Sequence, residues 1–348
     1  MPNIEDLLKR MVANQASDLL LVADISPTVR VGGELRPLLN AALTSVEARH
    51  LVYSLLNAAQ IKRFERTYEL DFSHFHPDLG RFRVNVHYQR GSVATAIRYL
   101  STHIPLFHEL GLPDSVRDFA AKRNGLVLVT GPAGSGKSTT LAALIHLINT
   151  QRACHIITIE DPIEYVHTSE KSVVEQREIH TDTHSYAEAL KHVLRQSPDV
   201  ILIGEMRDLE TIATALTAAE TGHLVLATLH TIDACQTVDR IIDSFPADQQ
   251  NQIRSQLSIS LAGVISQTLL PRTDGAGQVV AAEVMKLTPA IGASIRNNKT
   301  SQIYSSIQTG KADGMQTRDQ ALKALVQAET VEYAAALPYV KDLTYFRG

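Results

Sequence analysis

The first hundred residues carry one helical pattern of hydrophobic positions, followed by several strand-like patterns. Apolar residues recur at helical spacing from Ile4 to Val12, which predicts an amphipathic helix over residues 4–15. Thr44, with Glu47 three residues later, has the form of a capping box and predicts a second helix that ends near Leu56. Alternating apolar and polar residues predict strands over 18–22, 28–31, 68–73, 80–88 and 93–100, with a Gly-Gly hairpin signal after the second. These elements describe a small α+β domain over residues 1–100 with an antiparallel sheet.

The hydrophobic pattern changes after residue 100. Residues 101–113 include Pro105 and Gly111 and show no period, so they predict a linker. Beyond it, continuous apolar runs alternate with helical stretches, which is typical of a parallel sheet covered by helices. From about Asp248 the pattern is largely helical, so residues 256–348 are expected to form a mostly helical C-terminal part. The strands predicted for this second domain, residues 114–348, are 126–129, 155–159, 200–203 and 223–228. The fold class is therefore α/β.

A glycine-rich loop follows the first strand of the second domain. The stretch GPAGSGKSTT fits the pattern G-x-x-x-x-G-K-[ST] at every fixed position and stands between a strand and a helix. Its glycines let successive backbone N–H groups surround a phosphate chain, and the amino end of the helix adds partial positive charge. Lys137 can reach the β- and γ-phosphates, and the Ser138 hydroxyl can bind Mg²⁺. The predicted nucleotide-binding residues are Gly131, Pro132, Ala133, Gly134, Ser135, Gly136, Lys137, Ser138 and Thr139.

Polar residues follow the later strands of this domain. In open α/β sheets ligands bind beyond the carboxyl ends of the strands, so Glu164, Glu205 and His230 are expected to converge near Lys137. Glu205 ends the run VILIGE, in which Gly204 takes the place of the usual aspartate. Glu205 is therefore the carboxylate expected to act on Mg²⁺, through a water molecule. Hydrolysis of a triphosphate also needs an oriented water, and Glu164 is the candidate general base for it.

Each of these assignments has a plainer alternative. Glu160, Asp161 and Glu164 could only cap the turn that follows their strand, which is a common use of acidic residues. The phosphate loop nearby favours the catalytic interpretation for Glu164. A lone histidine at a strand end is more often a structural hydrogen-bonding residue than a catalytic one. A second charged strand end at the same place favours His230 as a phosphate sensor, and His223 less so.

The first domain carries a set of arginines on its predicted strands. Arg81 and Arg83 share one strand face, because side chains two residues apart point the same way. Arg90 and Arg98 lie on the next stretch. The pattern alone leaves two interpretations open. The arginines could cover a solvated sheet face, or they could meet a γ-phosphate bound by a neighbouring subunit, where positive charge accelerates hydrolysis.

Composition narrows the class of protein. The 348 residues are 44% hydrophobic, as in a globular protein, and no apolar run reaches the ~20 residues that a membrane-spanning helix needs. A net charge of −4 and a pI near 6.4 argue against nucleic acid as the main partner. Cys154 and Cys235 are isolated, so a disulfide framework and a zinc site are both disfavoured, which fits a reducing cytosol.

Four stretches together carry a family resemblance. In chain order they are GPAGSGKSTT, IITIEDPIEYVH, SPDVILIGEMRDLETI and TGHLVLATLHT. They resemble the secretion-ATPase superfamily, which includes GspE-, PulE- and VirB11-like proteins. The flanking GRFRVNVH, SSIQTG and GMQTRDQ are similar to those of the PilT-type retraction ATPases of type IV pili, so the resemblance covers nearly the whole chain.

The resemblance implies a fold, an assembly and a location. PilT-type proteins are cytoplasmic homo-hexameric ring motors with an N-terminal PAS-like domain and a C-terminal RecA-like ATPase domain. Their hydrolysis of ATP, with Mg²⁺, drives removal of pilin at an inner-membrane platform protein, in twitching motility. Implied partners are this platform protein and a paralogous retraction ATPase, with no nucleic acid. The protein would therefore meet the membrane only through partners, peripheral to the inner membrane.

The resemblance also implies roles for individual residues. Lys137 and Ser138 match the residues that bind ATP and Mg²⁺, and Glu164 matches the catalytic glutamate. Glu205 matches the Walker B acid and His230 the histidine of the His box. Arginines that face the nucleotide across domains or subunits are matched by Arg81, Arg83 and Arg98.

Two positions depart from the family pattern. In AIGASIRN, residues 290–297, Gly292 stands where the family has an arginine, while Arg296 is kept. That motif is associated with retraction rather than hydrolysis, so its change bears on coupling. Leu20 stands where the family commonly has a histidine. A divergent or accessory motor of a related secretion, conjugation or pilus-assembly system is therefore an alternative.

Other function classes fit less well. A nucleic-acid translocase is disfavoured by the acidic pI and by an aromatic content of only 5%, with no stripe of basic and aromatic residues for stacking bases. A small-molecule kinase would transfer phosphate to an acceptor and would not need a ring. Assembly motors of the superfamily usually carry an extra N-terminal domain and often a four-cysteine zinc motif. This chain starts almost directly at the PAS-like domain and has neither, which favours retraction.

Overall fold

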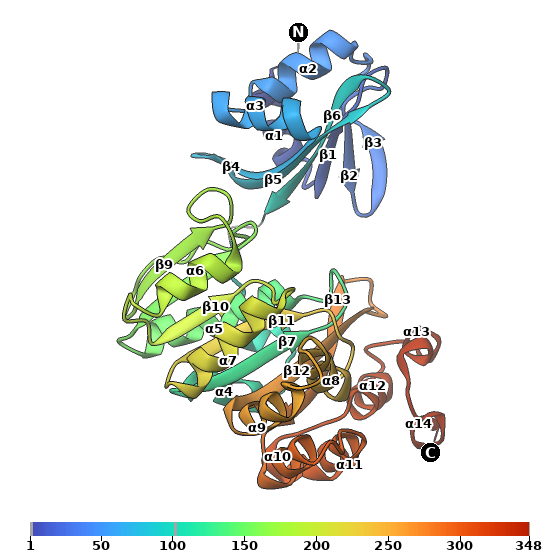
Figure 1. Ribbon diagram of the computed structural model, residues 1–348. Helices are drawn as coiled ribbons and strands as arrows, with labels where there is room; N and C mark the ends of the chain where they lie inside the picture. The colour runs from blue at the N-terminus through green and yellow to red at the C-terminus, as the bar shows by residue number, and fades with distance from the viewer. Residues whose placement is uncertain (1–2, 101–102, 348) are drawn as a thin grey trace. The chain divides into compact units, whose positions relative to one another are not determined.

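The computed structural model describes residues 3–100 and 103–347, which form two compact units (Figure 1). The first unit ends at His103 and the second begins at Ile104. Of the predicted linker, residues 101–102 lie outside the described residues. The rest includes the short 3-10 helix η1 (Phe107–Leu110), and Phe107 and Leu112 are buried in the core of the second unit. Most of the predicted linker is therefore part of the second unit, because its apolar side chains pack into that core.

The first unit is a six-stranded sheet with three helices packed on it (Figure 1). The strand order is β3-β2-β1-β6-β5-β4, and every neighbouring pair is antiparallel. Thr44 and Glu47 form the predicted capping box at the start of α2. The elements are α1 (Ile4–Ala13), β1 (Asp18–Leu21), β2 (Thr28–Val31), β3 (Glu34–Pro37), α2 (Ser45–Tyr53), α3 (Ala58–Thr67), β4 (Glu69–His76), β5 (Gly80–Gln89) and β6 (Ser92–Leu100).

Two of these elements were not predicted. Helix α3 has a single buried residue, Phe64, and its apolar stripe is short, because only Ala58, Ile61 and Phe64 recur at helical spacing. A second capping box, formed by Asn57 and Gln60, marks its start and was the available signal. Strand β3 has no buried residue, and its alternation of polar and apolar positions is only four residues long, which is too short to predict a strand.

The second unit is built on a seven-stranded sheet. The strand order is β13-β12-β7-β11-β10-β8-β9, and all neighbours are parallel except the antiparallel pair β12 and β13. The strands are β7 (Gly125–Thr130), β8 (His155–Glu160), β9 (Val173–Glu178), β10 (Val200–Ile203), β11 (Leu224–Leu229), β12 (Leu261–Pro271) and β13 (Gln278–Lys286). The helices up to β12 are η2 (Asp114–Val116), α4 (Asp118–Ala121), α5 (Lys137–Gln151), α6 (Tyr186–Val193), α7 (Leu209–Glu220), α8 (Ala234–Asp243) and α9 (Gln250–Ser260).

Helices cover both faces of this sheet, as the sequence predicted. Alternate residues of the central strand β7 enter two different cores. Leu126 and Leu128 pack with α6 to α9 on one face, whereas Val127 and Val129 pack with α4 and α5 on the other. Because both faces are covered, β7 is an unbroken apolar run rather than an alternating one.

The prediction of a mostly helical region from residue 256 was wrong for β12 and β13. Both strands are buried over most of their length on both faces, including the polar residues Ser266, Gln267, Thr268 and Glu283, so their apolar runs show no two-residue period. Such a run does not by itself distinguish a buried strand from a buried helix. The helical part begins after Lys286. It comprises α10 (Pro289–Arg296), α11 (Ser301–Thr309), η3 (Gly310–Asp313), α12 (Arg318–Gln327), α13 (Tyr333–Ala336), η4 (Leu337–Tyr339) and α14 (Leu343–Arg347).

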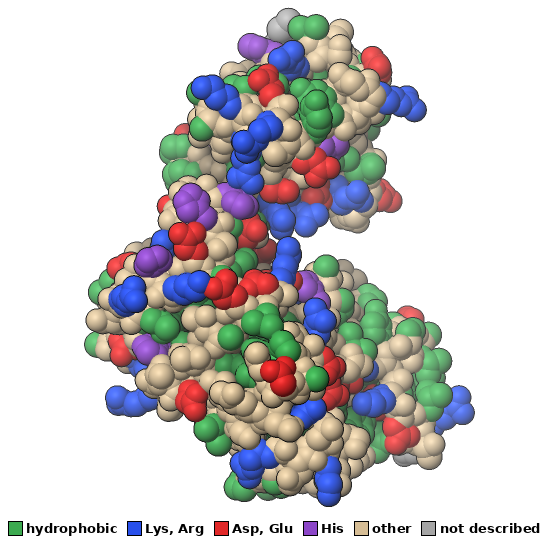
Figure 2. Space-filling view, in the orientation of Figure 1, with side chains coloured by type: hydrophobic (Ala, Val, Ile, Leu, Met, Phe, Trp, Pro, Cys, Tyr) green, Lys and Arg blue, Asp and Glu red, His purple; other side chains and the backbone are tan. Residues whose placement is uncertain are grey.

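Hydrophobic side chains are exposed over α13 and α14 (Figure 2). Those that the structure exposes there are Tyr333, Leu337, Tyr339 and Leu343. Across residues 3–100 and 103–347, no helix combines the length and the apolar composition needed to cross a membrane.

Candidate active site

The phosphate loop lies between β7 and α5, in the context that the motif requires. Gly131 has a φ of +141°, and a Cβ at this position would lie only 2.5 Å from the backbone oxygen of Gln267. A side chain is therefore excluded at the point where the chain leaves the strand. Gly136, with a φ of +86°, precedes the first residue of α5. The predicted nucleotide-binding residues from Gly131 to Thr139 thus form one continuous loop and the first turn of a helix.

The Lys137 side chain is folded back onto this loop. Its Nζ donates hydrogen bonds to the carbonyl oxygens of Gly131 at 2.9 Å and Pro132 at 2.8 Å. Burial lowers the pKa of Lys137, while the charges of Glu205 and Glu164 act in the opposite direction. The two carboxylates therefore lie within electrostatic reach of the lysine, as the sequence predicted.

Glu205 and His230 meet at the ends of β10 and β11. Glu205 Oε1 lies 3.0 Å from His230 Nε2, and Glu205 Oε2 lies 2.7 Å from Nη2 of Arg207. Although burial alone would raise the pKa of Glu205, Arg207 and His230 together hold it below its ordinary value. The Glu205 side chain is only 17% exposed, and its two partners both position this carboxylate and favour its ionised form.

The space around Gly204 explains why no aspartate stands there. A Cβ on Gly204 would lie 2.8 Å from the hydroxyl of Tyr186 and 3.3 Å from the carbonyl oxygen of Ile159. The Tyr186 hydroxyl is buried against β8 and β10, and burial raises its pKa. A side chain at 204 would therefore have to displace the Tyr186 hydroxyl, and Glu205 is the next residue after β10 that can present a carboxylate.

Glu164 lies in a loop that begins after β8 and is braced by side chains of β9. Gln176 Nε2 donates to the carbonyl oxygen of Tyr165 at 2.8 Å, and Gln176 Oε1 accepts from the backbone N–H of His167 at 2.7 Å. The Tyr165 hydroxyl lies 2.9 Å from Thr139 Oγ1 in the first turn of α5. The loop that carries Glu164 is thus tied to the helix that begins at the phosphate loop.

Glu160 is a half-buried carboxyl group near Glu164 that the sequence suggested only as a cap. Burial raises its pKa to about 7, against hydrogen bonds from Thr158 and Gln176 that favour the charged form. The Thr158 hydroxyl donates to Glu160 Oε1 at 2.7 Å. Gln176 Nε2 also donates to Glu160 Oε1 at 3.2 Å. Glu160 is therefore linked through Gln176 to the loop that carries Glu164.

Three further residues of the site were missed by sequence reasoning. Arg207 stands in the quoted stretch SPDVILIGEMRDLETI, two residues beyond Glu205, and that spacing was the available signal. Gln176 gave no signal, because strand β9 is at the edge of the sheet and half polar. Tyr165 stands next to Glu164, but only the folded loop reveals its contact with Thr139.

The predicted arginines all lie in the first unit. Arg81 and Arg83 share one face of β5, as predicted, and alternate with buried residues. Arg98 on β6 is opposite Arg83, and its Nε donates to Asp18 Oδ1 at 2.9 Å. The role of these arginines toward a nucleotide stays a prediction.

Gly292, which replaces an arginine of the family pattern, lies at a close approach between two helices. A Cβ there would lie 3.0 Å from the carbonyl oxygen of Ser258 in α9. Arg296, the arginine that is kept, donates from Nη1 to Ser258 Oγ at 3.2 Å. The packing of α10 on α9 therefore uses the absence of a side chain at 292.

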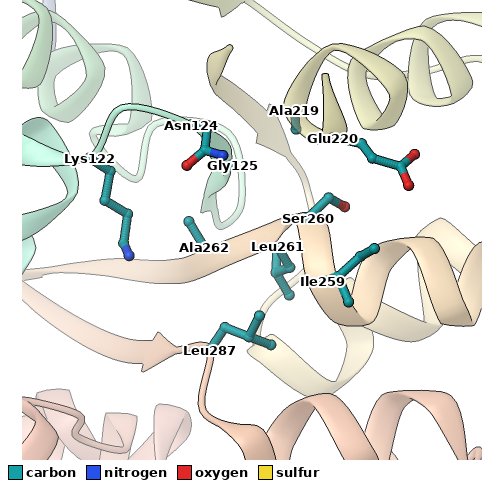
Figure 3. Close-up of a pocket in the computed structure, with 10 residues that line it drawn as sticks. All are labelled: Lys122, Asn124, Gly125, Ala219, Glu220, Ile259, Ser260, Leu261, Ala262 and Leu287. Carbon is teal, nitrogen blue, oxygen red and sulfur yellow. The ribbon is translucent and has the colours of Figure 1, made fainter. Parts of the chain in front are cut away.

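A pocket of about 240 Å³ lies at the opposite end of β7 (Figure 3). Its walls come from the loop before β7, the end of α7, the junction between α9 and β12, and Leu287. Strand β7 spans six residues, so roughly 17 Å separate this pocket from the phosphate loop. It includes neither the glycine loop nor Glu164 and Glu205, and it is not the predicted nucleotide site.

Comparison with known proteins gives one family and several relatives. Residues 108–336 match the family described as type II/IV secretion system protein. The chain is 49% identical to the type IV pilus retractation ATPase PilT of Pseudomonas aeruginosa, over 93% of this chain and 94% of that protein. It is 41% identical to the type IV pilus ATPase PilU of the same organism, over 99% of this chain and 90% of that protein. The crystal structure of the pilus retraction motor PilT with bound ADP superposes with a TM-score of 0.93 at 46% identity and covers 99% of both chains.

Proposed function

Because the chain belongs to the family of type II/IV secretion system proteins, we propose that it is the motor that retracts type IV pili. It is an ATPase of the PilT type, with the mixed α/β fold of that family. One observation carries the proposal. Lys137, Glu164 and the Glu205–His230 pair converge at one phosphate loop, in a chain that resembles a retraction ATPase along nearly its whole length.

The residues at the loop suit a nucleoside triphosphate. Within the described residues, the Ser135 hydroxyl is buried and has no hydrogen-bond partner, so a phosphate oxygen could accept from it. Lys137 Nζ now donates to two loop carbonyls and would exchange them for the β- and γ-phosphates. No group of three or more His, Cys, Asp or Glu side chains among the described residues could hold a metal by itself. That fits Mg²⁺ in a P-loop site, where Ser138 and Glu205 would supply the few protein contacts and the phosphates the others.

Each residue then has a role in hydrolysis. Glu164 orients and polarises the attacking water, and its loop is held at a set position by Gln176 and Tyr165. Ser138 and Glu205 would hold Mg²⁺, which when bound would supply positive charge to the phosphate oxygens. His230, which would sense the γ-phosphate, contacts Glu205, which would act on Mg²⁺. Arg81, Arg83 and Arg98 would face a nucleotide held by another domain or subunit and stabilise the transition state.

The assembly and its partners follow from the family. We infer a homo-hexameric ring in the cytoplasm, in which hydrolysis moves the two units of each chain against one another. The ring would act on an inner-membrane platform protein and meet the membrane only through it. A paralogous retraction ATPase is a further expected partner, since relatives named PilT and PilU occur in one organism.

Deletion of the gene followed by imaging of surface fibres tests this proposal. Loss of a retraction motor should leave excess fibres and abolish twitching, and wild-type protein should restore both. Lys137→Ala should not restore them. A matched control is Lys299→Met, which removes a cation from an exposed turn of the second unit and should complement fully.

The other outcomes each identify a different function. Cells without fibres would indicate an assembly motor, and unchanged fibres would indicate another secretion or conjugation system. Purified protein should also release inorganic phosphate from ATP without nucleic acid. A rate that depends on added nucleic acid and falls steeply with salt would instead favour a translocase.

A further inference from the structure

The segment that follows His230 is held from outside by the C-terminal part of the chain. Thr231 to Asp233 connect His230, at the end of β11, to the start of α8. Arg318, the first residue of α12, donates from Nη1 to the carbonyl oxygen of Ile232 at 3.3 Å. Lys341, in the turn before α14, donates from Nζ to Asp233 Oδ2 at 3.4 Å. Arg318 and Lys341, which are distant in sequence from this segment, therefore each bind one of its residues, Ile232 and Asp233.

The start of α8 is fixed from β13 as well. The backbone N–H of Ala234 donates to Glu283 Oε1 at 2.8 Å, and Asp233 Oδ1 accepts from the N–H of Gln236 at 2.8 Å. Glu283 and Asp233 are both buried, at 2% and 6% exposure. Burial raises the pKa of Glu283, while the charges of Arg318 and Lys341 act against this. The two cations thus compensate two buried carboxylates beside the His230 segment.

Asp319 connects the backbone at Arg318 to the backbone at Lys341. It is 1% exposed and accepts from the backbone N–H groups of Lys341 at 2.9 Å and Asp342 at 2.7 Å. Because Asp319 follows Arg318 directly, the positions of Arg318 and Lys341 are set together. The Lys341 ammonium also lies 4.5 Å from the centre of the Tyr304 ring. Its side chain is 46% exposed, but its direction is fixed by these neighbours.

The C-terminal region that carries Arg318 and Lys341 is hydrogen-bonded to the sheet of the second unit. Gln316, two residues before Arg318, forms a pair of backbone hydrogen bonds with Val284 of β13, at 2.9 and 3.1 Å. Helix α12 also packs against β13 (Figure 1). A change in the position of the C-terminal helices would therefore move Arg318 and Lys341 and, through them, the segment after His230.

We propose that Arg318 and Lys341 are positioning residues for ATP hydrolysis, which hold the segment after His230 so that this histidine meets Glu205. The inference rests on the proposed function of the same site. Neither cation touches the phosphate loop in the structure, so each acts through the segment that it holds. His230 is 52% exposed and meets Glu205 at 3.0 Å, so its own surroundings constrain it little and the flanking segment sets its position. A displacement of about 1 Å at a catalytic group can lower the rate about 100-fold. Loss of the contacts from Arg318 and Lys341 should therefore lower turnover by displacing His230.

Steady-state kinetics of the purified, assembled enzyme test the proposal. Lys341→Met and Arg318→Met should each lower kcat about tenfold and leave KM for ATP nearly unchanged, because the phosphate loop is untouched. Lys341→Arg keeps the positive charge and should restore most of the rate. Lys299→Met, a matched loss of an exposed lysine in the same C-terminal part, should have no effect.

A double-mutant cycle separates positioning from simple stabilisation. If Lys341 acts through His230, Lys341→Met should cause no further loss of kcat in a His230→Ala background. Equal losses in both backgrounds would overturn the proposal, and so would unchanged kcat in the single variants. If Lys341→Met does not fold, Lys341→Gln, which keeps a donor, takes its place in the same cycle. A wild-type enzyme without ATP turnover would refute the proposed function itself, whereas a normal enzyme with inert Arg318 and Lys341 would refute only this inference.

Discussion

Replacing Glu164 by glutamine should leave ATP bound but unhydrolysed. The substitution keeps the shape of the side chain and removes its charge and its basicity. The hydrogen bonds that hold the loop use other groups: Gln176 binds the backbone of Tyr165 and His167, and the Tyr165 hydroxyl contacts Thr139. The loop should therefore keep its position. Loss of a negative charge near Lys137 should if anything favour the triphosphate, so affinity for ATP should be equal or tighter.

The expected size of the effect follows from the role of a general base. Such a group contributes about 10²–10⁴-fold to rate. At about 1.36 kcal/mol per tenfold, this corresponds to about 2.7–5.4 kcal/mol of transition-state stabilisation. A side chain that only capped a turn would contribute to folding instead, with a change in turnover of less than about threefold.

Phosphate release measures turnover, and binding of a fluorescent ATP analogue measures affinity. Glu170→Gln is the matched control, because Glu170 is an exposed carboxylate farther along the same loop. It should leave both quantities unchanged. Near-normal hydrolysis by Glu164→Gln would refute the catalytic role, and loss of ATP binding would assign Glu164 to the structure of the loop.

Four shorter predictions concern neighbouring positions. Lys137→Ala should abolish turnover without lowering the melting temperature, and measurable hydrolysis in this variant would contradict the phosphate-loop assignment. The carboxyl of Glu160 has a pKa raised from 4.5 to about 7, so the folded state binds the extra proton and the free energy of unfolding should fall as pH rises between these values. The fall is at most about 3 kcal/mol, and Glu160→Gln should remove it in urea unfolding at pH 5 and pH 8. Gly204→Ala should destabilise the fold by about 2 kcal/mol through contact with the Tyr186 hydroxyl, with partial rescue by Tyr186→Phe in the double variant. Arg83→Ala should lower turnover of the assembled ring more than it weakens nucleotide binding by isolated subunits; an equal effect on both would argue against a role across the ring.

Much of the fold could be predicted because burial of one or both faces of an element produces a pattern of apolar residues in the local sequence. The antiparallel strands of the first unit alternate apolar and polar residues, and a capping box marks the start of the helix after Thr44. The parallel strands around β7 are unbroken apolar runs, because helices cover both faces of their sheet. Where that pattern was missing or ambiguous, prediction failed. Strand β3 buries no residue and helix α3 only Phe64, and β12 and β13 are buried on both faces, so they show no two-residue period.

The sequence by itself determined the chemistry of the loop, because a phosphate cradle needs glycines, a lysine and a hydroxyl at fixed local spacing. It also placed Glu205 and His230 just after strand ends and Glu164 in the loop after β8, and a parallel sheet brings these positions to one edge. Tertiary structure alone decided how these groups are held. Gln176 braces the Glu164 loop from an edge strand, a side chain at Gly204 would have to displace the Tyr186 hydroxyl, and Lys341 reaches Asp233 from 108 positions along the chain. Contacts across such separations leave no periodic pattern in the sequence, since they depend on how elements pack rather than on which elements form.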